Sequence, residues 1–247
     1  MFSYVGWLVA PVLAIAFGML SSSRLHAGSV TQPIAEPEII APKSLTLDLE
    51  GFYAGGDLAY AFGSRDDVGH RASSGQLVAT PGTLVPGGPN WGLKIGWRDK
   101  IQSTGLAFVY GVELGYIAGG IGDSFSTATH QAEIDVKRHL ALRLKGGVAS
   151  IPGDMQFYGI LGYARADLDY SVAGTAGGDT ISVSDQSDYD GVLLGLGVER
   201  ALRENLSMML EYEYTRFSSK TAYDAGGSST VITPGFGNLR LGLNFAF

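Results

Sequence analysis

The sequence predicts an all-β protein, a transmembrane antiparallel up-and-down β-barrel of eight strands. Three observations support this fold class. No apolar run beyond Leu49 is long enough for a transmembrane helix. Eight later segments alternate apolar residues with small or polar ones, and the connections between them alternate between long and short. In lipid the backbone polar groups must pair with one another, so strands that cross a membrane must close into a barrel.

The composition fits one domain of this kind. The 247 residues include 36 glycines and no cysteine, and the formal net charge is -7. Without cysteine there is no disulfide framework, thiolate nucleophile or cysteine metal site. The negative charge argues against a nucleic-acid partner, because phosphate binding needs a basic face.

Residues 1–27 are predicted to be a signal peptide. An apolar core runs from Val5 to Leu20, which is short for a helix that must span about 30 Å of hydrocarbon. Leu25-His26-Ala27 resembles a cleavage site, and we place cleavage after Ala27. An uncleaved anchor helix is the alternative interpretation.

Residues 28–48 are predicted to be a Pro-rich periplasmic segment, and residues 49–247 the barrel. Pro33, Pro37 and Pro42 lie among small and polar residues, a composition typical of an extended tether. We expect this segment to be poorly ordered.

The first three strand segments show a clear period of two, with one apolar face and one small or polar face. The residues predicted to face outward are Phe52, Ala54, Gly56, Leu58, Tyr60 and Phe62; Trp91, Leu93, Ile95 and Trp97; and Leu106, Phe108, Tyr110, Val112, Leu114 and Tyr116. The first inward face contains Asp57, the second Lys94 and Arg98, and the third Glu113.

The fourth and fifth segments are less regular. The fourth sets one apolar face against one charged face, with Arg138 as an exception on the apolar face. Its predicted outward residues are Ile134, Val136, Leu140, Leu142 and Leu144, and its inward residues are Asp135, Lys137, His139, Arg143 and Lys145. The fifth segment, residues 154–169, is apolar on both faces around Phe157, so the pattern does not assign its register.

The last three segments alternate again. Their predicted outward residues are Val192, Leu194, Leu196 and Val198; Leu206, Met208, Leu210, Tyr212 and Tyr214; and Leu239, Leu241, Leu243, Phe245 and Phe247. Their inward faces contain Glu199, then Glu211 and Glu213, then Arg240. Several aromatic residues lie near segment ends, as in the interfacial girdles of membrane barrels.

The connections place both chain ends in the periplasm. Long connections are predicted at 64–90, 117–132, 170–188 and 218–235, and short ones at 99–103, 147–153 and 200–205. Within the first long connection, Gln76–Thr80 and Thr83–Val85 flank Pro81-Gly82, so a further hairpin and a ten-stranded barrel are the alternative. A soluble β-sandwich is a second alternative.

A charge network is predicted inside the barrel, because an eight-stranded barrel is only wide enough for side chains to fill it. The residues predicted to belong to it are Asp57, Lys94, Arg98, Glu113, Lys137, His139, Arg143, Lys145, Glu211, Glu213 and Arg240. Both signs are present, so the charges are expected to pair and plug the lumen, since unpaired buried charges are costly. A narrow ion path is the alternative.

No catalytic, cofactor or metal site is predicted. Of the four histidines, His26 lies in the signal peptide, His70 and His130 in predicted solvated loops, and His139 in the lumen, where we expect a hydrogen bond. None has a serine and an acid at a catalytic spacing. The acidic residues of the later loops show no calcium-loop spacing, so a dispersed solvated face is favoured over a divalent-cation contact.

Three stretches carry a family resemblance: Gly51-Phe52-Tyr53-Ala54-Gly55-Gly56, Tyr110–Tyr116, and Arg240–Phe247. Together they resemble the OmpA- and OmpX-like outer-membrane barrels, and within these the alphaproteobacterial surface-antigen porin family, some members of which bind haemin. Phe245 and Phe247 resemble the C-terminal signal that the outer-membrane assembly machinery reads.

The sequence and this resemblance together lead to an expected function. We expect an outer-membrane surface protein of a Gram-negative bacterium, not an enzyme, with a role in envelope integrity and surface interaction as an antigen or adhesin. A small porin and a haemin-binding surface protein are the alternatives. The expected partners are outer-membrane lipid, lipopolysaccharide, the barrel assembly machinery and surface ligands of the external loops.

Overall fold

The computed structural model describes residues 45–103, 105–150 and 153–247. The predicted signal peptide, and the predicted tether up to residue 44, lie outside the described residues. Thirteen strands occur in the described ranges. No helix within these ranges is long and apolar enough to cross a membrane.

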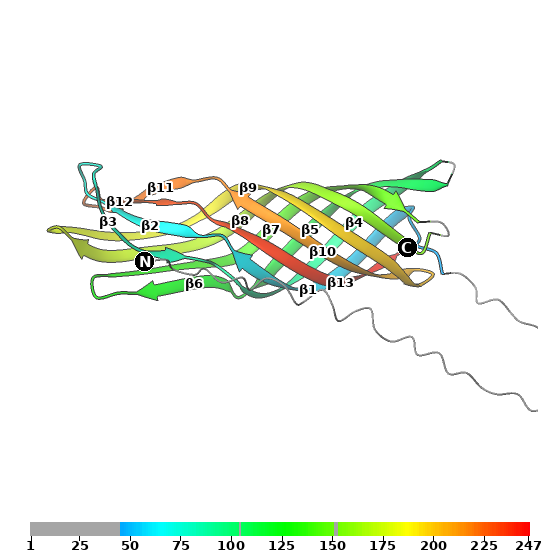
Figure 1. The fold of residues 1–247 in the computed structure, drawn as a ribbon, viewed down its shortest axis with the longest axis horizontal. Coiled ribbons are helices and arrows are strands. Elements are labelled where there is room, and N and C mark those ends of the chain that lie inside the picture. The colour runs from blue at the N-terminus through cyan, green and yellow to red at the C-terminus, as the bar shows by residue number, and fades with distance from the viewer. Residues whose placement is uncertain (1–44, 104, 151–152) are drawn as a thin grey trace, which may run out of the picture. The chain divides into compact units, whose positions relative to one another are not determined.

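Eight of the strands form a closed antiparallel ring (Figure 1). In ring order they are β1 (Gly51–Gly63), β4 (Gly88–Ser103), β5 (Leu106–Gly119), β7 (His130–Ala149), β8 (Met155–Ala176), β9 (Asp179–Arg203), β10 (Leu206–Phe217) and β13 (Gly235–Ala246). The first strand closes the ring by pairing with the last, with Leu58 opposite Leu241. The eight-stranded barrel is therefore confirmed, and the ten-stranded alternative is wrong.

The predicted long loops are largely strand. β7, β8 and β9 continue past the barrel and, with β6 (Ile121–Ser126), form one wall of an extension. A separate sheet in the order β11 (Lys220–Tyr223), β12 (Ser229–Ile232), β2 (Asp66–Arg71), β3 (Leu77–Leu84) forms the other (Figure 1). We call these two walls and their turns the extension.

Two of the connections predicted to be loops show how the structure differs from the prediction. The predicted loop 170–188 is a hairpin whose turn is Gly177–Gly178, with positive φ angles of 60° and 88° that favour glycine. In the first long connection, β3 runs through Pro81 and Gly82 as one strand paired with β2, so the hairpin predicted around these residues is wrong.

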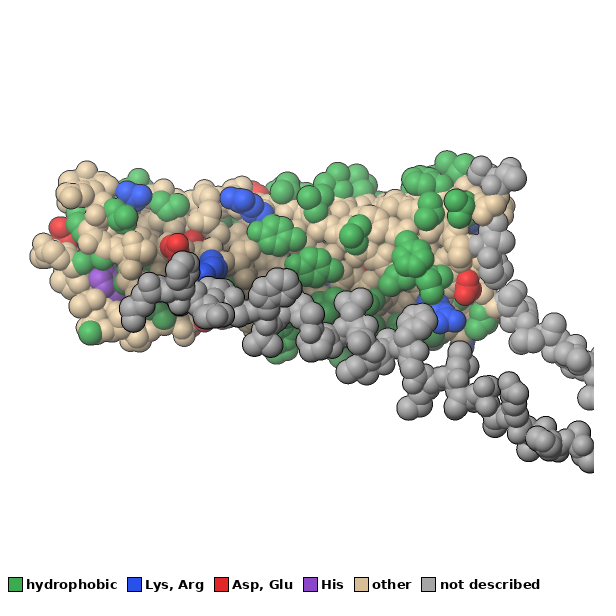
Figure 2. Space-filling view, viewed as in Figure 1, with side chains coloured by type: hydrophobic (Ala, Val, Ile, Leu, Met, Phe, Trp, Pro, Cys, Tyr) green, Lys and Arg blue, Asp and Glu red, His purple; other side chains and the backbone are tan. Residues whose placement is uncertain are grey.

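The predicted alternation is confirmed on the outer surface of the barrel. Leu58 is 74% exposed and Leu196 72% exposed, whereas the inward Asp57 is buried. Figure 2 shows apolar side chains over the barrel half of the molecule and few over the extension. The structure also assigns the register of the fifth segment, because Phe157 and Leu161 face outward while Tyr158 and Ile160 are buried. We call this outer apolar surface the belt.

The fourth segment contains a β-bulge that the alternating pattern did not predict. Val136 pairs with Leu168 and Arg138 with Asp167, so Lys137 is an extra residue and the faces exchange there. Upstream, Ile134 and Val136 are buried, whereas Asp135 and Lys137 face solvent. The reason is that this part of β7 lies in the extension, where the interior is apolar and the outside is water.

Two apolar clusters lie inside. The larger one fills the extension, with Val68, Leu84 and Ile232 from one wall and Ile134 and Leu168 from the other. The smaller one lies at the end of the barrel opposite the extension and contains Leu47, Leu49, Val109, Ala149 and Ala201. Leu47 also donates its backbone N–H to the Gly153 carbonyl at 2.7 Å, so the described end of the predicted tether packs against the barrel.

We predict that the replacement Leu58→Arg lowers the free energy of unfolding by about 2–4 kcal/mol, because it places a charge in the lipid-facing belt. The matched replacement Leu77→Arg, in the extension, is expected to change it by less than about 0.5 kcal/mol, since Leu77 is exposed to water. Denaturant unfolding in phospholipid vesicles measures both. Equal effects would mean that Leu58 does not face lipid.

Candidate functional site

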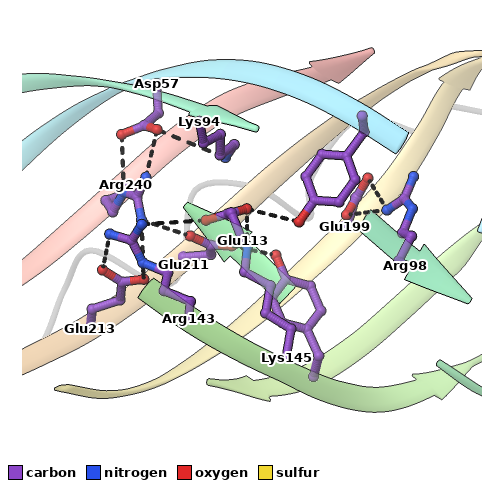
Figure 3. Close-up of polar contacts among 12 residues, drawn as sticks. Asp57, Lys94, Arg98, Glu113, Arg143, Lys145, Glu199, Glu211, Glu213 and Arg240 are labelled. Atoms are coloured by element: carbon purple, nitrogen blue, oxygen red, sulfur yellow. Dashed lines mark hydrogen bonds and ion pairs between the residues drawn. The ribbon is translucent and has the colours of Figure 1, made fainter. Parts of the chain in front are cut away.

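Charged side chains from seven strands gather inside the barrel (Figure 3). The eighth strand, β8, contributes Tyr158 and Gln156. The carboxylates are Asp57, Glu113, Glu199, Glu211 and Glu213, and the cations are Lys94, Arg98, Arg143, Lys145 and Arg240. The five cations balance the five carboxylates, so the cluster as a whole has no net formal charge. We call these ten residues the lumen network.

Arg240 is the centre of the network. Its Nε and Nη2 donate to the two carboxylate oxygens of Asp57 at 3.0 and 2.7 Å, a bidentate pair. Its Nη1 donates to Glu211 at 3.2 Å and to Glu213 at 3.0 Å. The Arg240 side chain is fully buried, so β13 joins strands β1 and β10 through charge-assisted hydrogen bonds within the barrel.

Arg143 repeats this arrangement from β7, on the opposite side of Glu213. Its Nε and Nη2 donate to the Glu213 carboxylate at 2.7 and 3.1 Å, and its Nη1 donates to Glu113 at 3.4 Å. Gly115 makes room for this guanidinium, because a Cβ at that position would overlap Arg143 Nη1. Part of the glycine content therefore lets large side chains fill a narrow interior.

Lys145 joins Glu113 to Glu211. Its Nζ donates to Glu113 and to Glu211, both at 2.6 Å. Tyr53 donates its hydroxyl to Glu113 at 2.9 Å, and Tyr158 donates to Glu211 at 2.7 Å. The two tyrosines were not predicted as members, although both lie on the inward faces of their strands.

A second group lies toward the end of the barrel opposite the extension. Arg98 Nη1 lies 3.0 Å from both carboxylate oxygens of Glu199, and Arg98 Nη2 donates to the Asp48 carbonyl at 2.5 Å. Gln156 and Ser207 also donate to Glu199. Glu199 was missed as a network residue, although its inward position in the alternation pointed to it.

Lys94 is the loosest member of the network. Its Nζ lies 3.8 Å from Asp57 and has no hydrogen-bond partner within the described part of the chain. The side chain is fully buried, so its charge is compensated by Coulombic attraction without a direct hydrogen bond.

Two residues predicted to belong to the network make no hydrogen bond or ion pair with it. Lys137 is outside the barrel because of the β-bulge, and pairs with Asp135 at 2.6 Å and Asp169 at 3.4 Å. His139 is buried as predicted, but its ring lies edge-on to the rings of Phe217 and Phe236, with ring centroids 5.9 Å apart in both pairs. Neither His139 nitrogen has a hydrogen-bond partner among the described residues, so the expected hydrogen bond is absent.

The two histidines predicted to be solvated loop residues are buried in strands. His70 of β2 is 1% exposed and His130 of β7 is 4% exposed. Their nearest ring nitrogens, Nδ1 and Nε2 respectively, are 3.0 Å apart. The prediction failed because no pattern in these segments indicated that they pair as strands.

The acidic residues of the predicted loops fasten the extension. Asp123 accepts the Val85 N–H at 2.7 Å, and Asp224 accepts the Ser182 N–H at 3.1 Å, so each carboxylate ties one wall to the other. Within the described ranges, no three histidine or acidic side chains converge as a metal site.

The C-terminal phenylalanines lie at the end of the ring opposite the extension. Phe245 is exposed on β13, and Phe247 is 70% exposed. Phe247 donates its backbone N–H to the Phe52 carbonyl of β1 at 3.0 Å.

The closed ring, outer belt and inward charges define a transmembrane β-barrel of the outer-membrane type. The family of outer membrane protein β-barrel domains matches residues 41–247, and the chain belongs to this family. The protein is therefore located in the outer membrane of a Gram-negative bacterium.

Relatives place the chain among alphaproteobacterial surface proteins, as the sequence resemblance predicted. It is 27% identical over 256 residues to the 31 kDa outer-membrane immunogenic protein of Brucella melitensis, covering 96% of this chain and 98% of the relative. It is 31% identical over 206 residues to the 22 kDa outer membrane protein of Rhizobium leguminosarum, covering 80% and 78%. Among solved structures it is similar to OprG of Pseudomonas aeruginosa, with a TM-score of 0.49 and 14% identity over 83% of this chain and 100% of that chain.

We predict that Arg240→Met lowers the free energy of unfolding by about 3–5 kcal/mol, because it leaves Asp57, Glu211 and Glu213 buried without their shared cation. The same change at Arg138 is expected to cost about 1 kcal/mol or less, because the Arg138 side chain is 65% exposed and its pair with Asp167 is on the surface. Equilibrium unfolding in vesicles compares the two. A small loss for Arg240→Met would mean that the network contributes little stability.

Proposed function

We propose that this outer-membrane barrel acts through its outer surface as an envelope-stabilising and surface-interaction protein of antigen or adhesin type, with its lumen plugged by side chains. It is an outer-membrane surface protein, and the Brucella relative is named an immunogenic one. The proposal adds the specific role and the closed lumen.

The filled interior is the observation that carries the proposal. The lumen network occupies the membrane-spanning part, and above it His139, Phe217 and Phe236 pack together. The larger apolar cluster then continues through the extension. A solute would have to displace paired, desolvated charges and then cross an apolar core, and both steps are unfavourable.

The extension is the part of the protein that can meet other molecules. It is built from strands fixed by a core of its own, so its turns are presented on a rigid support. Such a support suits recognition, because less conformational entropy is lost when a partner binds a fixed surface.

The alternatives have less support from the geometry. A haemin-binding role would need an accessible axial ligand, whereas His70 and His130 are buried against each other. The proposal includes no catalytic activity, and the relatives are named as outer-membrane proteins.

Lipopolysaccharide is the lipid partner we propose. Arg138, Arg165 and Arg216 project outward where the belt gives way to the extension, next to Leu140, Tyr163 and Tyr214. Asp167 and Asp188 hold the first two guanidinium groups at 2.7 and 2.6 Å. Arginine at this level is suited to the phosphates of a lipid headgroup.

We also propose that the assembly machinery reads Phe245 and Phe247. Support comes from their exposure at the end of β13, the strand that closes the ring with β1.

We predict that the folded protein shows no discrete openings in planar-bilayer recordings, because the interior is filled. The heat-dependent shift of the folded barrel on an SDS gel, between unboiled and boiled samples, identifies the folded fraction to be recorded. Steady openings from that fraction would reject the plugged lumen and favour the porin alternative.

We predict that lipopolysaccharide stabilises the wild type more than it stabilises the triple variant Arg138→Gln, Arg165→Gln, Arg216→Gln. The expected loss is up to about 1 kcal/mol for each arginine. Unfolding is compared in vesicles with lipopolysaccharide, with its dephosphorylated form, and with phospholipid alone. Lys100→Gln, at the periplasmic end, is the control, and an equal gain for all variants would rule out these arginines as the phosphate contacts.

A further inference from the structure

A buried pair of histidines joins the two walls of the extension. His70 belongs to β2 in one wall and His130 to β7 in the other, and their rings meet edge-on with centroids 5.3 Å apart. His70 Nδ1 and His130 Nε2 are 3.0 Å apart, and Thr129 Oγ1 lies 2.9 Å from His130 Nδ1. The lumen network and the belt do not use this pair.

The groups around the pair pack closely against it and offer few partners for a charged ring. A Cβ at Gly174 of β8 would overlap the His130 ring, so β8 packs directly on it. On β12, Ser229 pairs with Arg71, so Thr230 stands opposite His70. His70 Nε2, Tyr170 Oη and Thr230 Oγ1 are all buried without a hydrogen-bond partner among the described residues.

The N–H of one ring must point at an unprotonated nitrogen of the other, so the bond between them uses one proton. With one added proton the pair is a cation that still has a donor and an acceptor. With both rings protonated, two N–H groups of like charge face each other in an apolar core, and the contact becomes repulsive. The contact is therefore attractive when the rings are neutral and repulsive when both are protonated. It changes between these two states within the pH range where histidine titrates.

We propose that the contact between His70 and His130 is a pH-sensitive latch between the two walls of the extension, closed when the rings are neutral and released when both are protonated. Release would loosen β2 from β7 and give water access to the apolar cluster between the walls. The proposal goes beyond the surface role above and does not depend on the ligand of that role.

The sign of the pH effect follows from burial. Burial and the facing ring of His70 lower the pKa of His130 below its ordinary value, so the open form binds protons more readily than the closed form. The closed form is therefore fully favoured above the ordinary histidine pKa and is lost as the pH falls below it. For His130, this shift lowers the ratio of closed to open molecules by up to about tenfold for each unit by which the pH falls.

Asp66 shares the buried face of β2 with His70, and Tyr170 lies on the buried face of β8, the strand that packs on His130. Burial raises the pKa of the Asp66 carboxyl, against the hydrogen bonds it accepts from Thr233. A raised carboxyl pKa makes the closed form bind protons more tightly, so acid would favour closure through Asp66, opposite to the histidines. Burial raises the pKa of Tyr170 to about 12, so Tyr170 stays neutral in this range.

The test measures the distance between the two walls in the full barrel. The chain has no cysteine, so Ser74→Cys in the β2–β3 turn and Ala128→Cys in the β6–β7 turn give two unique, exposed sites for spin labels. Double electron–electron resonance is recorded in lipid nanodiscs from about pH 7.5 to about pH 5, above the ordinary range of carboxyl titration. We expect a narrow distance distribution at the upper pH, and a broader, longer one at the lower pH.

Three variants show which residues are responsible for the opening at low pH. In His70→Asn with His130→Gln, amides stand close to the bonding nitrogens and cannot gain a charge, so the walls are expected to stay closed at both pH values. Asp66→Asn and His139→Gln, the latter at the junction of barrel and extension and outside the pair, are expected to open like the wild type. The gel shift on boiling verifies that each variant folds. If a variant does not fold, the pH titration of the wild type tests the proposal by itself.

Two results would overturn the proposal. The first is a wild-type distance distribution that does not change over this range. The second is opening that persists in the double histidine variant or disappears in Asp66→Asn, which would assign the response to another group.

Discussion

The pairing of β1 with β13 is the constraint on which the rest of the structure depends. It closes the ring, so the backbone of every spanning strand is paired without a free edge in lipid. Closure with eight strands also fixes a narrow interior. Side chains pointing inward must then fill it and satisfy each other, which is the condition that the lumen network meets.

The network and the extension meet the same requirement in two ways. In the membrane part, the belt takes the apolar side chains and the interior is polar, so Arg240 and Arg143 are enclosed by carboxylates. Above the belt the outside is water, and the inside holds Ile134, Leu168 and other apolar side chains. The bulge at Lys137 is where β7 changes from one arrangement to the other. One strand therefore serves two environments by inserting one residue.

Much of the barrel could be predicted because lipid and the interior impose opposite demands on alternate residues. Asp57, Glu113, Glu211 and Arg240 each lie on a face whose neighbours are apolar, and their inward placement follows from this alternation. Arg138 was the single residue that broke the pattern on β7, and it marks the bulge. The histidine pair could not be predicted, because His70 and His130 are 60 residues apart and come from segments with weak alternation.

The sequence by itself determined that the protein crosses the outer membrane as a barrel, most of the residues that form the belt, and most of the charges that share the interior. These properties depend on local periodicity and on the solvent each face meets. Only the tertiary structure decided which charges pair, that the long connections form a second β structure, and that the two histidines touch. Those contacts join residues distant in the chain, and their positions depend on strand register and on the closed ring, which no local pattern encodes.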